Sequence, residues 1–354
     1  MSDRFVRGGR LLAFGSGAAA SDAQHVAVEF VHPVLAGKRA LPALDLSMGY
    51  REWLPAVVRS EDIVIGFGPP AGDPQIDLAV RNAMSRGAMC LALPGTAGDY
   101  AIPAPSSDPF VHQEIIEILY HTLWETVHVF FERQSLGQVA GAASFLYPFL
   151  AEARQPSESV IPEVAASIRS KAACVEGLRD QVATEQGEAI MQATLAIHER
   201  VALGGTILSF GNGGSATDAT DLALDLVAPP KGYPSVPAIS LAAEPATLTA
   251  IANDIGPDAI FRRQLIAHGR PQDVAVAIST SGGSSNIIAA LIDARARGLL
   301  TVALLGYDGG EVLRRGLADH TLVVRSDQVP RVQEVQASIY HVMLDLLDAI
   351  RRDR

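Results

Sequence analysis

The sequence predicts an α/β protein built from two tandem, doubly wound units, each a parallel sheet flanked by helices. The first observation behind this prediction is an internal repeat. Leu11–Glu29 reads LLAFGSGAAASDAQHVAVE and Ile207–Asp225 reads ILSFGNGGSATDATDLALD, so that Gly15 pairs with Gly211 at an offset of 196 residues. The second observation is that short apolar runs alternate with helical patterns in both copies. Together they predict one fold that occurs twice.

The repeat continues in the same order to the end of each copy. Later matches join Asp62 (DIVIGFGPPAGDPQI) to Asp273 (DVAVAISTSGGSSNI) and Arg86 (RGAMCLALPG) to Arg297 (RGLLTVALLG) at an offset of 211, and Gln113 (QEIIEILYH) to Gln333 (QEVQASIYH) at 220. The offset between matching residues increases along the chain, and it does so only between the predicted helices and strands. This indicates loop insertions in the second copy, and a duplication rather than a chance similarity.

Short apolar runs rich in β-branched residues predict the strands of the second copy. They are Thr206–Phe210, Val236–Leu241, Val274–Ile278, Leu300–Leu305 and Thr321–Val324. Continuously apolar strands separated by helices are typical of a parallel sheet covered on both faces.

Long amphipathic patterns predict a last helix in each copy, near Val111–Glu132 and Val332–Ile350. Helical patterns also fill most of the stretch from Ile161 to Leu203, before the second copy. The tetrapeptide RQPS at 154–157 is typical of a linker. We therefore expect the domains 1–155 and 156–354.

The composition sets limits on the class of protein. The chain has 354 residues, of which 48% are hydrophobic and 19% charged, which is enough apolar material for packed cores and excludes a disordered or fibrous chain. A net charge of −11 is unfavourable for nucleic acid or an anionic membrane, so we expect neither as a partner. Two cysteines exclude a disulfide framework and favour a cytoplasmic location. No apolar run reaches the length of about 18 residues that a spanning helix needs.

Two loops of the second copy have the composition of a phosphate site. Gly211–Ser215 (GNGGS) and Ser279–Ser285 (STSGGSS) each follow a strand and precede a helix. Glycines let the backbone approach an anion, and helix N-termini offer free N–H groups. Neither loop has a nucleotide-binding spacing. The alternative is that these residues only cap helices.

The first copy lacks this chemistry. Its counterpart of the second loop is Gly68–Asp73 (GPPAGD), in which two prolines remove N–H donors and Asp73 would repel phosphate. We therefore expect the first copy to bind no phosphate through its own loops.

The first copy instead carries the residues of a metal or acid–base site. His25 and Glu29 share one helix face at i, i+4, and the last helix of this copy presents Gln113 and His121. These four side chains predict a divalent metal site, with zinc favoured, and Glu29 or His121 is also suited to general acid–base catalysis. The alternative is a solvated helix face with structural histidines.

The second copy has changed that face. Its corresponding residues are Asp221, Asp225, Gln333 and His341. One copy thus keeps the loops and the other keeps the His/Glu face. This division predicts one composite site for each pair of copies, with the related second site inactive.

These residues resemble the sugar isomerase (SIS) domain family, and within it the phosphoheptose isomerases. The stretches GNGGSATDA, LTAIANDIG, DVAVAISTSGGSSN, LLGYDGG and RVQEVQASIYH carry the resemblance over about residues 185–350, and the first copy resembles a diverged SIS domain over about 8–132. The resemblance implies a substrate- and phosphate-binding set of Asn212, Gly213, Gly214, Ser215, Asn253, Asp254, Ser279, Thr280, Ser281, Ser284 and Gln333. It also implies that His25, Glu29, Gln113 and His121 bind zinc, one ion for each composite site.

The reaction implied by the resemblance is conversion of sedoheptulose 7-phosphate to D-glycero-D-manno-heptose 7-phosphate through an enediolate. Glu29 is then the expected base, and His121 or His341 the expected acid. A homo-oligomer, such as a dimer of fused SIS pairs, is also implied. Two alternatives stay open: a non-catalytic phosphosugar-binding regulatory or assembly protein, and an isomerase of another sugar phosphate.

Overall fold

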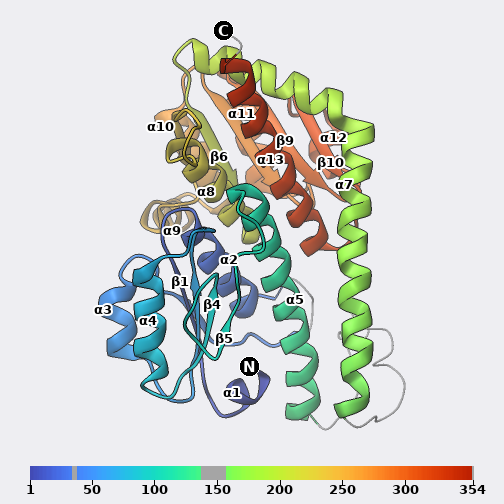
Figure 1. Ribbon diagram of the computed structural model, residues 1–354. Coiled ribbons are helices and arrows are strands. Elements are labelled where there is room, and N and C mark those ends of the chain that lie inside the picture. The colour runs from blue at the N-terminus through green and yellow to red at the C-terminus, as the bar shows by residue number, and fades with distance from the viewer. Residues whose placement is uncertain (34–37, 137–156, 353–354) are drawn as a thin grey trace. The chain divides into compact units, whose positions relative to one another are not determined.

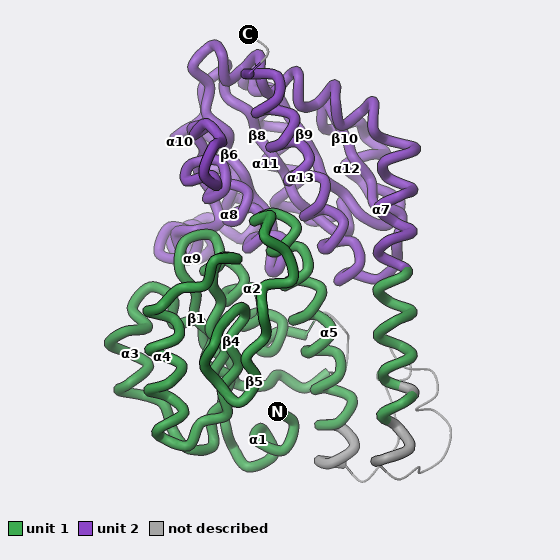
Figure 2. The backbone as a smooth tube through the Cα atoms, viewed as in Figure 1, with its two compact units in different colours: residues 1–173 green, residues 174–354 purple. Residues whose placement is uncertain are grey.

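The computed structural model describes residues 1–33, 38–136 and 157–352. The chain divides into two compact units, Met1–Ala173 (unit 1) and Cys174–Arg354 (unit 2), shown in different colours in Figure 2. The domain boundary predicted at residue 155 lies outside the described residues. The longest described helix, α7 (Ser157–Ala202), contributes residues to both units (Figure 1).

Unit 1 contains a parallel sheet of five strands in the order β2-β1-β3-β4-β5. Its elements in chain order are α1 (Ser2–Val6), β1 (Leu11–Gly15), α2 (Ala19–Val31), β2 (Ala43–Asp45), α3 (Tyr50–Val57), β3 (Ile63–Phe67), α4 (Pro74–Met84), β4 (Met89–Leu93), β5 (Tyr100–Ala101) and α5 (Pro109–Leu136).

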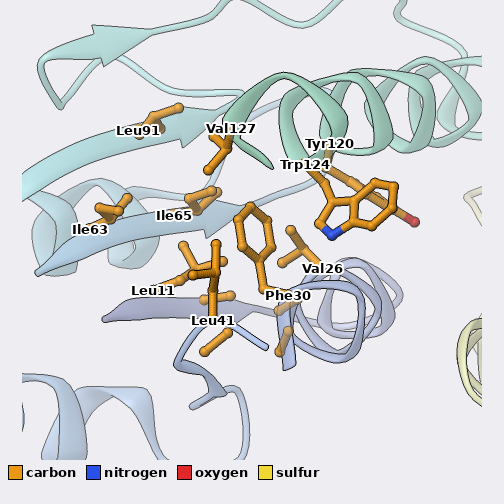
Figure 3. Packing of buried hydrophobic residues seen from close by; sticks show 14 of the residues in the cluster. Leu11, Val26, Phe30, Leu41, Ile63, Ile65, Leu91, Tyr120, Trp124 and Val127 are labelled. Atoms are coloured by element: carbon orange, nitrogen blue, oxygen red, sulfur yellow. The ribbon is translucent and has the colours of Figure 1, made fainter. Parts of the chain in front are cut away.

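Helices cover both faces of this sheet. The alternation along each strand sends residues such as Leu11 and Ile65 to one face, where they pack with α2 and α5. Figure 3 shows this layer, in which Phe30 of α2 and Trp124 of α5 belong to the same buried cluster as the strand residues. The intervening residues pack with α3 and α4 on the other face. The strands are therefore buried on both sides.

Unit 2 repeats the arrangement with a parallel sheet in the order β7-β6-β8-β9-β10. Its elements after α7 are β6 (Ile207–Gly211), α8 (Gly214–Val227), β7 (Ala238–Ser240), α9 (Pro245–Asp254), η2 (Pro257–Ala259), α10 (Ile260–His268), β8 (Val274–Ser279), α11 (Ser285–Ala296), β9 (Leu300–Gly306), α12 (Gly310–Arg314), β10 (His320–Val324) and α13 (Val329–Arg352).

One face of the second sheet packs against α10, α11 and α12, and the other lies under α7, α8 and α13. Residues 161–202 of the region predicted as helical belong to the single helix α7, which ends at Ala202. Within unit 2, α7 is fixed to the edge strand β10, because the Gln186 side chain exchanges two hydrogen bonds with the backbone of Val323, of 2.6 and 2.7 Å.

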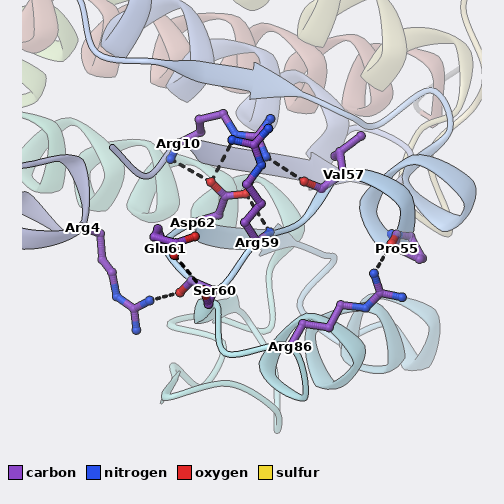
Figure 4. Close-up of polar contacts among 9 residues, drawn as sticks. All are labelled: Arg4, Arg10, Pro55, Val57, Arg59, Ser60, Glu61, Asp62 and Arg86. Atoms are coloured by element: carbon purple, nitrogen blue, oxygen red, sulfur yellow. Dashed lines mark hydrogen bonds and ion pairs between the residues drawn. The ribbon is translucent and has the colours of Figure 1, made fainter. Parts of the chain in front are cut away.

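The repeat is visible in the polar contacts at the amino ends of the strands. The buried Asp62 carboxylate accepts from the backbone N–H groups of Arg10 and Arg59, both at 3.0 Å, and pairs with the Arg10 guanidinium at 2.7 Å (Figure 4). In unit 2, Asp273 accepts in the same way from the N–H groups of Thr206 and Arg270, both at 2.8 Å. These carboxylates fix the loops that precede the central strands.

The structure confirms the predicted fold class, since both copies fold as five-stranded parallel sheets covered by helices. The predicted strand at Val236–Leu241 is shorter than expected, because Pro237 has no N–H to give to the sheet. None of the described helices combines the length and apolar character needed to cross a membrane.

Candidate functional site

Both predicted phosphate-binding loops of unit 2 begin at the carboxyl ends of adjacent central strands. The glycine loop (Gly211–Ser215) leaves β6, and the hydroxyl loop (Ser279–Ser285) leaves β8. In the sheet, β7 lies on one side of β6 and β8 lies on the other. The direction in which successive strands are added therefore reverses between β6 and β8, where the two loops begin. Open α/β sheets bind their ligands at such a switch point.

The glycine loop brings the backbone close to the start of α8. A Cβ atom at Gly211 would lie 2.2 Å from the carbonyl oxygen of Ser215, so no larger residue fits there. Gly213 has a φ of 59°, in the left-handed region that favours glycine. It precedes α8 without giving it a side-chain cap, and Ser215 is buried in the first turn. The N–H groups of this turn therefore remain suited to an anion.

The hydroxyl loop is ordered by its own serines. The buried Ser279 Oγ accepts a hydrogen bond from the N–H of Gly282 at 3.1 Å, and Ser281 Oγ accepts from the N–H of Gly283 at 3.2 Å. Ser284 is the N-cap of α11, yet its hydroxyl makes no cap hydrogen bond. Thr280 and Ser284 are half-buried and Ser281 is exposed. Hydroxyls and a helix N-terminus thus face the same carboxyl end of the sheet.

The two loops are linked across the switch point. Asn212 and Asn286 exchange two hydrogen bonds through their side-chain amides, each of 2.9 Å. A further close approach supports the hydroxyl loop, because a Cβ atom at Gly310 would lie 2.2 Å from the carbonyl oxygen of Ser281. These contacts hold the loops of unit 2 in a fixed geometry, which is a requirement for binding an anion without a basic surface.

The matching loop of unit 1 is used for its own structure. Asp73, at the position that corresponds to Ser284, caps α4 by accepting from the N–H of Gln75 at 2.8 Å. It also accepts from the Ser16 hydroxyl at 2.9 Å. The buried His112 donates through Nε2 to the Gly68 carbonyl at 3.2 Å, and burial lowers the pKa of this histidine, partly opposed by the hydrogen bond. A carboxylate here accounts for the expected loss of anion binding.

The predicted metal and acid–base residues of unit 1 lie together in its interior. His25, Glu29 and His121 are all buried, with ligand atoms within 4.8 Å of one another, and we call them the imidazole cluster. The Nε2 atoms of the two histidines are 3.4 Å apart, and His25 Nε2 lies 3.9 Å from Glu29 Oε1. Helices α2 and α5 therefore present one set of donors to a common point.

This cluster fits a zinc ion. Ligand atoms about 2.0–2.1 Å from a tetrahedral zinc lie about 3.4 Å from each other, and imidazole nitrogens with a carboxylate oxygen are ordinary zinc ligands. The spacing of the histidine nitrogens equals that value, and the distance of 3.9 Å between His25 Nε2 and Glu29 Oε1 exceeds it by about 0.5 Å. Glu29 and the two histidines would hold the ion.

Unit 2 forms the corresponding cluster from different residues. Asp221, Asp225 and His341 are buried with ligand atoms within 4.8 Å of one another, and we call them the carboxylate cluster. His341 Nε2 lies 3.4 Å from Asp225 Oδ2. The predicted change of residue type leaves the position of the cluster in the fold unchanged.

Two tyrosines that the prediction did not include contact these clusters. The Tyr120 hydroxyl lies 3.0 Å from His25 Nδ1, and Tyr340 donates to Asp221 Oδ2 at 2.8 Å. The sequence repeat could have indicated these tyrosines, because in both copies a tyrosine directly precedes the matching histidine, His121 or His341.

The remaining predicted site residues lie on α5, α13 and α9. Gln113 is half-buried on α5, eight residues before His121 and thus about 12 Å away along the helix axis. Gln333 is buried on α13. Asn253 and Asp254 are exposed and hydrogen-bond to each other at 2.8 Å, and no hydrogen bond among the described residues joins them to either loop. Their predicted roles remain predictions.

Comparisons with known proteins identify the family. A family model for the SIS domain matches residues 172–306. The phosphoheptose isomerase of Sulfurimonas denitrificans is 48% identical over 145 residues, which span 40% of this chain and 72% of that protein. The solved structure of a phosphoheptose isomerase from Francisella tularensis is 31% identical, with a TM-score of 0.50, and covers 52% of this chain and 98% of that one. The chain belongs to the SIS domain family.

The SIS architecture extends over both copies. The C-terminal domain of glucosamine-fructose-6-phosphate aminotransferase from Francisella tularensis covers 98% of this chain with a TM-score of 0.59 at 12% identity, a likeness that shows the fold alone. With phosphoheptose isomerases among its relatives, this SIS protein is a sugar phosphate isomerase, which confirms the predicted class of enzyme.

Proposed function

We propose that the protein interconverts sedoheptulose 7-phosphate and D-glycero-D-manno-heptose 7-phosphate. The observation that carries the proposal is the imidazole cluster of unit 1. Two histidines and a glutamate are buried with ligand atoms within 4.8 Å of one another, and the second copy has aspartates at two of these three positions. The phosphoheptose isomerase relatives support the choice of substrate.

The isomerisation moves one proton between neighbouring carbons. Glu29 removes a proton from C1 of the ketose, the C–H electron pair forms a C1–C2 double bond, and the C2 oxygen takes up a proton. The resulting enediol then loses the proton on O1, a carbonyl forms at C1, and C2 receives a proton to give the aldose. His121 is the proposed acid at the oxygen atoms, with His341 as the alternative.

A zinc ion bound by the imidazole cluster would supply Lewis-acid polarisation of the sugar carbonyl. His25 is the residue of this cluster without a proposed proton-transfer role, and its Nε2 already faces Glu29 and His121. Gln113 completes the proposed ligand set, because it matches the glutamine that the resemblance to the SIS family places at this site.

The loops of unit 2 are proposed to bind the phosphate at the far end of the sugar. Ser279, Thr280, Ser281 and Ser284 supply hydroxyls, and the first turns of α8 and α11 supply N–H groups. Binding energy gained at the phosphate then positions C1 and C2 for proton transfer. Asn212, Gly213, Gly214 and Ser215 complete this proposed set, with Asn253, Asp254 and Gln333 as further substrate contacts.

We further propose that the two copies, as the domains 1–155 and 156–354, contribute different residues to one reaction. The fused chain is proposed to form a homo-oligomer. What supports the division between the copies is the complementary loss of residue types. The loop of unit 1 has become structural through Asp73, and the helix face of unit 2 has exchanged imidazole for carboxylate at Asp221.

An NMR assay of the purified protein with sedoheptulose 7-phosphate tests the reaction directly. We expect the aldose product to accumulate, deuterium from solvent D2O to enter the carbon that receives the proton, and chelator to reduce the rate until zinc is restored. If the protein does not turn over this heptose but does turn over a pentose or amino-sugar phosphate, the proposed substrate is wrong and the second sugar phosphate replaces it. Phosphosugar binding without turnover of any of them would overturn the enzymatic proposal.

A further inference from the structure

We infer that Tyr120 is a positioning residue, which orients His25 and fixes the imidazole tautomer that can bind a metal ion. The inference rests on the proposed metal role of the imidazole cluster and deepens it. Tyr120 and His25 are both buried, and each residue has an exposed fraction of 2%. Their hydroxyl and Nδ1 atoms are 3.0 Å apart, within hydrogen-bond range.

The orientation of the His25 ring follows from its two nitrogens. Nδ1 faces the tyrosine hydroxyl, and Nε2 faces His121 Nε2 at 3.4 Å and Glu29 Oε1 at 3.9 Å. A neutral imidazole carries one N–H and one lone pair. Nε2 can bind a metal ion only if the proton is on Nδ1, and a partner on Nδ1 selects that tautomer. In this state the Tyr120 oxygen accepts the Nδ1–H hydrogen bond.

The second copy shows why a tyrosine suits this position. Tyr340 corresponds to Tyr120, and Asp221 corresponds to His25. Tyr340 donates to Asp221 Oδ2 at 2.8 Å, because an ionised carboxylate can only accept. A hydroxyl can accept from an imidazole N–H in unit 1 and donate to a carboxylate in unit 2. The tyrosine therefore retains its function although its partner has changed, which a purely donating or purely accepting side chain could not do.

Aromatic packing keeps the hydroxyl in place and offers a clean test. The Tyr120 ring packs edge-on against Phe67, with centroids 6.1 Å apart, and at 5.0 Å against His121. Tyr120→Phe retains these ring contacts and removes only the hydroxyl. Tyr340→Phe makes the same change in unit 2, and Tyr100→Phe makes it at an exposed position in β5.

The first measurement is the tautomer of His25 in the metal-free full-length protein, from long-range 1H–15N NMR spectra. The resonances are assigned by their loss in His25→Asn. We expect the Nδ1–H tautomer in the wild type and in Tyr340→Phe and Tyr100→Phe, and a shift toward the Nε2–H tautomer in Tyr120→Phe. An unchanged tautomer in Tyr120→Phe overturns the inference, even if activity falls, because a merely structural role would not move this readout.

The second measurement is zinc affinity, by competition with a chromophoric chelator. Loss of a hydrogen bond that orients a metal-binding histidine typically weakens metal affinity by about 10–100-fold, and we expect this for Tyr120→Phe but not for Tyr100→Phe. Equal affinities in the two variants would contradict the inference. If the wild type binds no zinc, the proposed metal role fails, and the tautomer measurement alone decides the role of Tyr120.

Discussion

The two units share one fold but use the polar side chains at matching positions differently. In unit 2, the N-cap Ser284 makes no cap hydrogen bond, and the N–H of Ile287 in the first turn of α11 donates to the Asn286 side chain. In unit 1, Asp73 at the same position caps α4 and accepts from Ser16. The Ser284 hydroxyl is therefore not used to cap its helix, whereas the Asp73 carboxylate at the matching position serves the structure of unit 1.

The helix faces differ in the opposite sense. Unit 1 keeps two imidazoles and a glutamate at one point, whereas unit 2 places two aspartates and one histidine at the corresponding point. The supporting tyrosine is present in both. A duplicated fold can therefore retain its geometry while each copy loses a different part of the chemistry, and substitutions at matched positions should reveal this.

The largest expected effect separates the two clusters. Glu29→Gln should lower kcat by about 10²–10⁴-fold, because general acid–base groups contribute that much to proton transfer. Its isosteric amide preserves size, so substrate binding should persist. Asp225→Asn, at the matching position of unit 2, should reduce kcat far less. Steady-state kinetics on both variants provides the comparison, and equal losses would show that the clusters are not specialised.

A smaller effect on substrate affinity is expected from the hydroxyl loop. Ser284→Ala removes a hydroxyl that makes no cap hydrogen bond, so the stability of unit 2 should change little. KM should rise by about 10–100-fold, since a hydrogen bond to a charged group contributes about 1.5–3 kcal/mol. Measured KM and a thermal melt by circular dichroism test this. A lower melting temperature with unchanged KM would make Ser284 structural.

The matched change in unit 1 should have the reverse outcome. Asp73→Ala removes an N-cap and should destabilise unit 1 by about 1 kcal/mol, with no change in KM. Both tryptophans of the chain, Trp53 and Trp124, lie in unit 1, so their fluorescence during denaturant unfolding reports on this unit. A raised KM in this variant would mean that the loop of unit 1 still contacts substrate.

The sequence was sufficient for the fold and for the proximity of the imidazole cluster, because both depend on patterns. Alternation and repeat predicted two parallel sheets, and the i, i+4 spacing of His25 and Glu29 predicted a common helix face. The contribution of α5 was also predicted, since His121 meets those residues. What the sequence could not supply was the contact between helices. The tyrosine hydroxyl at His25 depends on how α2 and α5 pack, which no local pattern encodes.

Loop functions were also only partly predictable. The prolines and Asp73 predicted a loop in unit 1 that does not bind an anion, but they did not predict that Asp73 caps α4 and accepts from Ser16. The pairing of Asn212 with Asn286 joins residues 74 positions apart, and it forms only because β6 and β8 are neighbours in the sheet. Such side-chain contacts follow from strand order, which must be known first.

The smallest expected effect concerns acid stability and again distinguishes the units. In the sequence repeat, the buried His112 of unit 1 corresponds to Val332 of unit 2. This titrating group is therefore present in one copy only. Burial lowers the pKa of His112 in the folded state, so the unfolded chain binds the proton more readily. The stability from the neutral imidazole is complete above its unfolded pKa of about 6.5 and is lost as the pH falls through the lower folded value. His112→Gln can still donate to the Gly68 carbonyl but cannot titrate. Tryptophan fluorescence during unfolding from pH 7 to pH 5 should therefore show a shallower loss of unit 1 stability in this variant, and identical slopes would assign the acid sensitivity of unit 1 to other groups.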